Sequence, residues 1–197
     1  GAGVGKVSGP GPTTSPSPTP TGPTPTPTVT PTPTVAATPT PLPDGIVLWR
    51  ETFDKVPDGT NIKNSTTDLD NPSSFNTSEM SGTLIVNAGE LTMGSQRFTF
   101  TTDLSNATHL YVTIKNPEAV SNLTLCVGDS YADKGAVGQT GYRAHGQYNV
   151  DNTTYQEFIV TLNPTLKSSN KIQFRGVVGT SSTAGLIVDE IKVVKVP

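Results

Sequence analysis

The sequence predicts an all-β protein, an antiparallel β-sandwich of the jelly-roll type preceded by a disordered linker rich in Pro and Thr. From residue 46 onward, apolar and polar residues alternate with a period of two, which is the pattern of half-buried strands. No stretch of eleven or more residues there shows the 3.6-residue period of an amphipathic helix. Before residue 44 the chain consists largely of Pro, Thr, Ser and small residues, which offer too little apolar surface to build a core.

Residues 1–43 are therefore expected to form a tether, and residues 44–197 a single folded domain. Only five of the 18 prolines follow residue 43, and each proline fixes φ and removes a backbone hydrogen-bond donor. At about 3.1 Å per residue, roughly 30 such residues could hold two bodies on the order of 90 Å apart. Because a tether joins two bodies, we expect a further module beyond it, with residues 1–7 as a remnant of that module.

Composition and charge exclude several classes of function. The net charge is −3 and the Lys and Arg residues are not clustered, which argues against a nucleic-acid-binding protein. The apolar runs are far shorter than the roughly 20 residues needed to cross a bilayer, so no membrane partner is expected. Cys126 is the only cysteine, which excludes an internal disulfide. The abundance of Thr, Ser, Asn and Gly is typical of secreted all-β proteins, so we expect an extracellular monomer.

Strands are expected wherever an alternating segment is bounded by turn residues. Clusters such as Pro57-Asp58-Gly59, Asn87-Ala88-Gly89 and Asn163-Pro164 mark the turns, because Gly and Asn accept positive φ and Pro cannot continue a strand ladder. In chain order, the predicted strands are residues 46–53, 83–86, 90–93, 97–101, 109–115, 122–127, 142–148, 155–162, 171–178 and 186–196. Short strands separated by turns in this way favour a sandwich.

The same alternation assigns the core, because successive side chains of a strand point to opposite faces of the sheet. Burying one large apolar side chain contributes roughly 1.5–3 kcal/mol, so a register that exposed a whole set would be strongly disfavoured. The predicted inward sets are Phe98 and Phe100; Leu110, Val112 and Ile114; Leu123, Leu125 and Val127; Phe158, Val160 and Leu162; and Ile172 and Phe174.

The opposite faces of these strands carry the candidate ligand-binding residues, among them three of the four arginines. A guanidinium group can bind a carboxylate through two parallel hydrogen bonds, and Tyr or His rings can lie against the apolar face of a sugar. As an alternative, these are ordinary solvent-facing positions whose charges pair across strands with Glu157 or Asp129. The predicted ligand-binding residues are Arg97, Tyr111, Lys115, Arg143, His145, Gln147, Gln173 and Arg175, together with Tyr131 and Tyr142 from a Gly-rich segment at 129–148.

Two carboxylates fall on the predicted core face. Alternation places Asp189 with Ile187 and Ile191, and Glu51 with Trp49. Since an unpaired buried carboxylate is unfavourable by several kcal/mol, and first and last strands are often neighbours, a divalent cation could neutralise both. Ca²⁺ fits best because it takes 6 to 8 oxygen ligands. As an alternative, each acid lies at a strand end and contacts water or backbone amides. The predicted structural Ca²⁺ ligands are Glu51, Asp54 and Asp189.

No catalytic motif is present in the sequence. The two histidines are too few for a zinc site of three imidazoles, and no His-Glu-x-x-His, Gly-x-Ser-x-Gly or Walker loop occurs. Carboxylates such as Glu79, Glu90 or Glu157 could form a glycosidase pair, but spacing along the chain does not show that any two converge. We therefore expect a domain without catalytic residues.

The linker and two short motifs resemble parts of a known class of secreted protein. The folded part opens with Glu51-Thr52-Phe53-Asp54 and Pro57-Asp58-Gly59, and it closes with Val188-Asp189-Glu190-Ile191-Lys192-Val193. Together with the Pro-Thr repeats, these motifs resemble the non-catalytic carbohydrate-binding modules of secreted bacterial polysaccharide-degrading enzymes. The resemblance implies a jelly roll whose acidic residues on the first and last strands ligate a structural Ca²⁺. The chain departs from modules that bind crystalline cellulose, because alternation buries Trp49, its only Trp.

The sequence thus predicts a carbohydrate-binding module that targets an attached catalytic domain to plant cell-wall polysaccharide. An acidic polymer such as pectin is the first candidate ligand, because of the outward arginines, and neutral hemicellulose or fructan comes next. Two alternatives stay open. One is a structural or adhesive β-sandwich module of a cell-surface protein, and the other is a small polysaccharide lyase or hydrolase.

Overall fold

The computed structural model describes residues 5, 9–11, 45–93, 96–118, 123–130, 144–177 and 185–197. The chain divides into two units, Gly1–Pro39 and Thr40–Pro197, a few residues from the boundary that the composition predicts. Most of the predicted linker lies outside the described residues. Every described strand and helix lies in the second unit, and none of the described helices is long or apolar enough to span a membrane.

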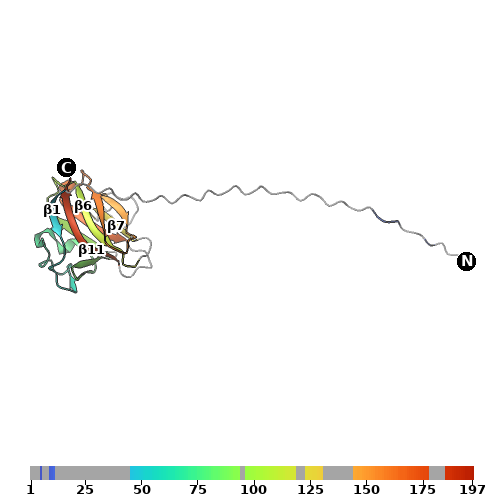
Figure 1. The fold of residues 1–197 in the computed structure, drawn as a ribbon, viewed down its shortest axis with the longest axis horizontal. Coiled ribbons are helices and arrows are strands. Elements are labelled where there is room, and N and C mark those ends of the chain that lie inside the picture. Colours follow the sequence, from blue (N-terminus) through green and yellow to red (C-terminus); the bar gives the residue numbers. More distant parts are fainter. Residues whose placement is uncertain are drawn as a thin grey trace. The chain divides into compact units, whose positions relative to one another are not determined.

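The second unit is built from β-strands and short 3-10 helices, and the described residues contain no α-helix (Figure 1). This confirms the all-β class. The strands are β1 (Ile46–Glu51), β2 (Thr60–Asn61), β3 (Leu84–Asn87), β4 (Glu90–Met93), β5 (Arg97–Thr101), β6 (His109–Lys115), β7 (Thr124–Gly128), β8 (Gly146–Asn149), β9 (Gln156–Thr161), β10 (Lys171–Val177) and β11 (Leu186–Lys195). The 3-10 helices are η1 (Pro72–Ser74), η2 (Thr77–Glu79) and η3 (Lys167–Ser169).

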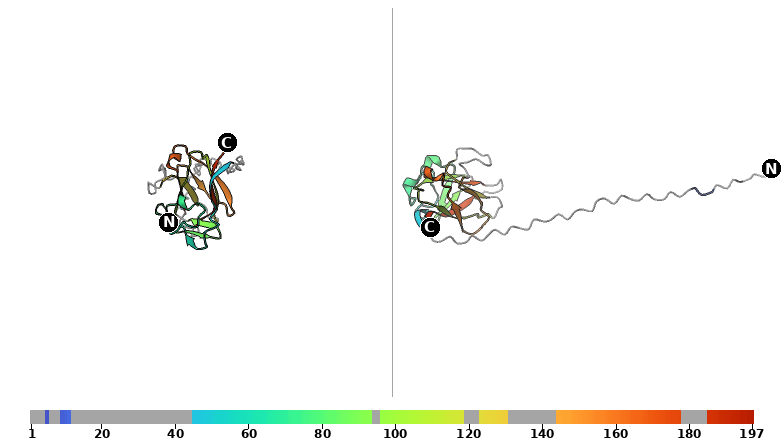
Figure 2. Two further views of the ribbon diagram at one scale, coloured as in Figure 1. Left: turned by 90° about the vertical axis from the view of Figure 1, so that its left-hand side faces the viewer. Right: turned by 90° about the horizontal axis from the view of Figure 1, so that it is seen from above.

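The strands form two antiparallel sheets, which Figure 2 shows from two further sides. The seven-stranded sheet has the order β2-β3-β4-β11-β6-β9, and β1 pairs with the C-terminal part of β11 while β4 pairs with its N-terminal part. Figure 1 shows β1, β11 and β6 side by side. The four-stranded sheet has the order β5-β10-β7-β8. Aromatic side chains from both sheets meet between them, which makes the fold a sandwich.

The core lies where alternation placed it. Phe98 and Phe174 stack with ring centroids 6.0 Å apart, and Phe75 packs against Phe98 from the segment that follows η1. Phe158 is only partly buried. The other predicted core residues are all buried: Phe98, Phe100, Leu110, Val112, Ile114, Leu123, Leu125, Val127, Val160, Leu162, Ile172 and Phe174.

Local sequence also explains the β3–β4 hairpin. Asn87 and Glu90 are the last paired residues, and the two residues between them have positive φ, 50° at Ala88 and 73° at Gly89. Two consecutive positive φ values define the tight hairpin turn that matches the twist of the strands. The predicted turn at this position is therefore confirmed.

Alternation fails in β11, where a β-bulge interrupts the pairing with β6. Val188 pairs with Ile114 and Glu190 pairs with Thr113, so Asp189 is an extra residue without a partner in the ladder. Such an insertion reverses the side-chain parity of the residues that follow. Asp189 is consequently half-buried rather than part of the core. The prediction that Asp189 points inward is wrong for this reason.

Candidate functional site

The structure places part of the predicted binding set on the outer face of the four-stranded sheet. Arg97 on β5 and both Gln173 and Arg175 on β10 alternate with the buried Phe98 and Phe174. Gln147 on β8 lies in the same transverse row as Arg175, because both are paired with the same residue of β7. These predicted residues therefore share one face.

Other members of the predicted set lie elsewhere. Tyr111 and Lys115 belong to β6 and lie on the outer face of the seven-stranded sheet. Tyr131, Tyr142 and Arg143 lie outside the described residues. Among the described members of the set, four thus lie on the face of the four-stranded sheet and two on the face of the seven-stranded sheet.

On the face of the four-stranded sheet two arginines occupy directly opposed strand positions. Arg97 and Arg175 are paired across β5 and β10. Burial lowers the pKa of Arg175, and the positive charge of Arg97 acts in the same direction. Like charges at directly opposed strand positions are unfavourable. The sheet therefore concentrates positive charge at one place.

Next to this pair the surface is hollowed. The hollow measures about 230 Å³ and lies between η2 and strands β5 and β10. We call it the β5–β10 hollow, and it is lined by Ser78, Glu79, Arg97, Ser130, Lys171 and Gln173.

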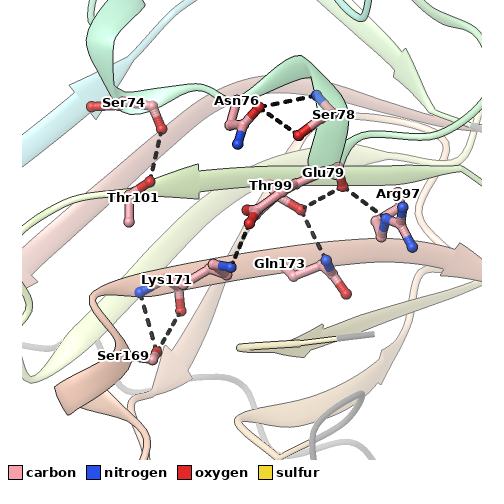
Figure 3. Close-up of polar contacts among 10 residues, drawn as sticks. All are labelled: Ser74, Asn76, Ser78, Glu79, Arg97, Thr99, Thr101, Ser169, Lys171 and Gln173. Atoms are coloured by element: carbon pink, nitrogen blue, oxygen red, sulfur yellow. Dashed lines mark hydrogen bonds and ion pairs between the residues drawn. The ribbon is translucent and has the colours of Figure 1, made fainter. Parts of the chain in front are cut away.

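Glu79 holds one wall of the hollow in place (Figure 3). Its backbone carbonyl accepts hydrogen bonds from Arg97 Nε at 2.7 Å and from Thr99 Oγ1 at 3.2 Å. Its carboxylate oxygen Oε1 lies 2.7 Å from Lys171 Nζ. η2 begins at Thr77 and is capped by Asn76, whose side chain accepts from the Ser78 amide at 3.1 Å. Glu79 therefore contacts two of the cationic side chains that line the hollow.

Gln173 also lines the hollow and is only 6% exposed. Its Nε2 donates to Thr99 Oγ1 at 2.9 Å, whereas its Oε1 is buried and accepts no hydrogen bond. A buried polar atom without a partner is unfavourable by about 1–3 kcal/mol. The carboxamide thus keeps an unused acceptor in a residue that lines the same hollow as Arg97 and Lys171.

On the opposite sheet, the predicted residues are engaged in a network of charges and rings. Lys115 Nζ lies 3.4 Å from Glu90 Oε1 and 4.1 Å from the centroid of the Tyr155 ring. Lys192 Nζ lies 5.6 Å from the centroid of the Tyr111 ring. Lys192 also pairs with Glu157 on β9, beyond the intervening strand β6, and with Glu190 on its own strand β11. Lys115 is therefore engaged with neighbouring side chains, although its partner is Glu90 and not the Glu157 or Asp129 of the alternative.

His145 was predicted to face outward, and this is wrong because it is 7% exposed. Its Nδ1 accepts a hydrogen bond from the backbone amide of Asn163 at 2.8 Å, and its Nε2 is buried without a partner. Burial lowers the pKa of the imidazole, although the nearby Asp129 charge acts in the opposite direction. His145 thus joins the start of β8 to the segment after β9 and does not face a ligand.

The predicted calcium ligand Glu51 is fully buried and surrounded by amides. Its Oε1 accepts from the amides of Phe53 at 3.2 Å and Asp70 at 3.1 Å, and its Oε2 accepts from the Asn71 amide at 3.3 Å. Burial raises the pKa of Glu51, and these hydrogen bonds partly oppose the shift. Three N–H groups donate to this carboxylate. A cation would instead need further oxygen ligands around it. The alternative in which this acid contacts backbone amides is the arrangement observed.

Asp54 and Asp189 lie together at a different place. They line a hollow of about 130 Å³ with Arg50, Thr52 and Glu190. Burial raises the pKa of Asp189, and the neighbouring carboxylates add to the shift. Within the described ranges, no group of three or more His, Cys, Asp or Glu side chains is arranged to hold a metal ion. The predicted three-carboxylate site is not assembled, and calcium binding by Asp54 and Asp189 stays a prediction.

Of the six residues that line the β5–β10 hollow, sequence reasoning predicted Arg97 and Gln173 and missed Ser78, Ser130 and two charged residues. Lys171 has the same parity as Gln173 and Arg175 on β10, so alternation alone could have found it. Glu79 lies in a 3-10 helix that has no alternating pattern, and only the tertiary contact with Lys171 reveals it.

Comparison with known proteins gives similarity at the level of structure alone. No family model and no curated protein sequence matches the chain. A glycoside hydrolase family 43 arabinoxylan arabinofuranohydrolase from Bacillus subtilis, solved with cellotetraose, has 13% identity over 56% of this chain, with a TM-score of 0.38. The match spans about a fifth of that enzyme, 22%. A carbohydrate-binding module of Cellvibrio mixtus lichenase 5A, solved with cellotriose, has 9% identity over 77% of this chain and 100% of the module, with a TM-score of 0.37. The function of this chain has to be argued from its own site.

Proposed function

We propose that the folded unit is a polysaccharide-binding module without catalytic activity and that its ligand binds at the β5–β10 hollow. The observation that carries this proposal is the arrangement of Gln173, with a buried and unused acceptor, beside Arg97 and Lys171 in one surface hollow. Sugars present many hydroxyl groups that both donate and accept hydrogen bonds. A site of fixed polar and cationic groups complements such a surface.

The charges of the site favour an acidic glycan. Among the described residues, Arg97 and Lys171 in the hollow and Arg175 beside it supply three positive charges, and Glu79 in the hollow supplies one negative charge. A guanidinium group matches a carboxylate in shape and can bind it through two hydrogen bonds. At about 230 Å³ the hollow is smaller than the roughly 300–1,000 Å³ of typical small-molecule pockets. We therefore propose that it holds one unit of a uronic-acid polymer such as pectin.

The linker would connect the glycan-binding unit to a catalytic module. Attachment through residues 1–43 would keep a catalytic module at high local concentration near the glycan to which the folded unit binds. Secretion of the parent protein, a catalytic partner and plant cell-wall polysaccharide as the target are all part of the proposal. Neutral hemicellulose or fructan is the alternative ligand.

Affinity gel electrophoresis tests the proposal. The protein is run in native gels that contain polygalacturonate, xylan or hydroxyethylcellulose and, in parallel, in gels without polysaccharide. We expect retardation by polygalacturonate and less by the neutral polymers. Lys171→Gln should lower the retardation, whereas the matched control Lys195→Gln, at an exposed position of β11, should not.

Other outcomes would favour the alternatives. Unchanged migration in every gel, and no binding on a broad glycan array, would support a structural or adhesive module. Release of reducing ends or unsaturated products from polygalacturonate by the isolated unit would show a hydrolase or a lyase.

A further inference from the structure

We infer that Glu79 is an internal competitor of the ligand, because its carboxylate occupies the position on Lys171 that the carboxylate of an acidic sugar would take. The inference rests on the proposed function and names how the same site is regulated. It follows from an ion pair inside the hollow, with 2.7 Å between Glu79 Oε1 and Lys171 Nζ.

This ion pair is accessible to a ligand. The Glu79 side chain is 34% exposed and the Lys171 side chain is 30% exposed, and both line the hollow. Ion pairs that reach solvent are weak, because water and salt screen the attraction and both long side chains lose freedom. A polymer that brings its own carboxylate can therefore replace Glu79 on Lys171.

Displacing the carboxylate would leave the wall of the hollow intact. The carbonyl of Glu79, and not its side chain, accepts the hydrogen bonds from Arg97 and Thr99. The next residue, Met80, is 2% exposed and anchors the segment in the core. The side chain of Glu79 is thus the only part of η2 that must move.

The negative charge of Glu79 also affects which glycans the hollow can bind. In the ligand-free protein it pairs with one of the cations of the site, and a neutral glycan has no carboxylate with which to replace it on Lys171. An acidic glycan can pair with Lys171 only after its own carboxylate has replaced that of Glu79. Glu79 thereby favours polymers with regularly repeated carboxylates, which can rebind before they diffuse away.

The test is the variant Glu79→Gln, compared with wild type on purified oligogalacturonates by isothermal titration calorimetry and on polygalacturonate gels. Removing the Glu79 carboxylate should lower Kd about two- to fivefold. This is the ratio of dissociation constants that corresponds to the free energy of an exposed ion pair. The matched control is Glu157→Gln, which loses the same charge from a carboxylate that pairs with Lys192 on the other sheet. The control should leave Kd unchanged.

A second variant isolates the role of Lys171. In the Lys171→Gln background, Glu79→Gln should give a smaller gain than in wild type, because the competed cation is gone. A gain of the same size in both backgrounds would overturn the inference. So would weaker binding or unchanged binding by Glu79→Gln, since weaker binding would mean that Glu79 contacts the ligand directly. If wild type binds none of the glycans, the proposed function itself fails, which is a separate result.

Discussion

Trp49 and Phe100 stack face to face across the two sheets, with ring centroids 4.2 Å apart and ring planes inclined by 2°. Trp49 lies on β1 of the seven-stranded sheet, and Phe100 lies on β5 of the four-stranded sheet. The indole Nε1 donates to Ser74 Oγ at 3.1 Å. The only Trp of the chain therefore joins the two layers of the sandwich and is not a platform for a sugar ring.

Trp49→Ala should lower the free energy of unfolding by about 3–5 kcal/mol, because it leaves a cavity between the sheets. Trp49→Phe should lower it less, since a ring still packs on Phe100 while the hydrogen bond to Ser74 is lost. Urea unfolding followed by far-UV circular dichroism measures both changes. A loss below about 1 kcal/mol for the alanine variant would contradict a structural role for this stack.

Glu51→Ala should destabilise the protein by about 3 kcal/mol or more, because it leaves the amides of Phe53, Asp70 and Asn71 without their acceptor. Glu51→Gln should have a smaller effect, since the carboxamide oxygen still accepts a hydrogen bond. Some loss of stability remains, because the NH₂ group of Gln cannot accept and faces an N–H donor. Chemical denaturation of both variants checks this order. Equal stability of Glu51→Ala and wild type would show that these hydrogen bonds contribute nothing.

The stability of the folded unit should fall when the pH drops below about 6.5, in part because of His145. Burial lowers the pKa of its imidazole below the usual 6.5, so the unfolded chain takes up this proton at a higher pH than the folded protein. The free energy of unfolding therefore decreases as the pH falls through the unfolded pKa toward the folded one. Urea denaturation at pH 7.5, 6.5 and 5.5 measures the slope. His145→Asn, which can still accept from the Asn163 amide, should reduce this dependence of stability on pH. An unchanged slope would show that other titratable groups cause it.

Asp189→Asn should stabilise the protein at pH 7 in the presence of EDTA. Burial and the nearby Glu190, Glu90 and Asp54 raise the pKa of Asp189. The charged form is thus disfavoured in the folded state above that pKa, and a neutral side chain removes the repulsion. Thermal unfolding in EDTA should show a higher Tm for the variant.

The same measurement tests calcium binding by Asp54 and Asp189. If they bind Ca²⁺, millimolar Ca²⁺ should raise the Tm of wild type and leave that of Asp189→Asn nearly unchanged. A wild-type Tm that does not respond to Ca²⁺ would show that the calcium prediction is wrong.

The two outer faces should differ in binding. Arg175→Gln removes a cation beside the β5–β10 hollow and should weaken retardation by polygalacturonate about two- to tenfold. Lys115→Gln removes a cation from the other sheet, where Lys115 pairs with Glu90 and packs on Tyr155, and should not change it. If Lys115→Gln reduced retardation and Arg175→Gln did not, the ligand would bind to the seven-stranded sheet.

The fold class and most of the core could be predicted from the sequence, because the period of two is a local property of the chain. Leu110, Val112 and Ile114 on β6 are buried as alternation requires. The prediction failed at Asp189, where a bulge inserts one residue and reverses the parity. It failed again at His145, which lies just before the strand β8, where alternation does not apply.

The sequence by itself determined a β-sandwich with Trp49 inside and most charged side chains outside, since burial of apolar surface depends on which residues alternate. Only the tertiary structure decided which outward residues lie together. Strand order places Arg97 opposite Arg175, moves Tyr111 and Lys115 to the other face, and brings Glu79 to Lys171 across 92 positions of sequence. The physical reason is that side-chain parity is set between neighbouring residues, whereas strand order is set by the packing of the whole core.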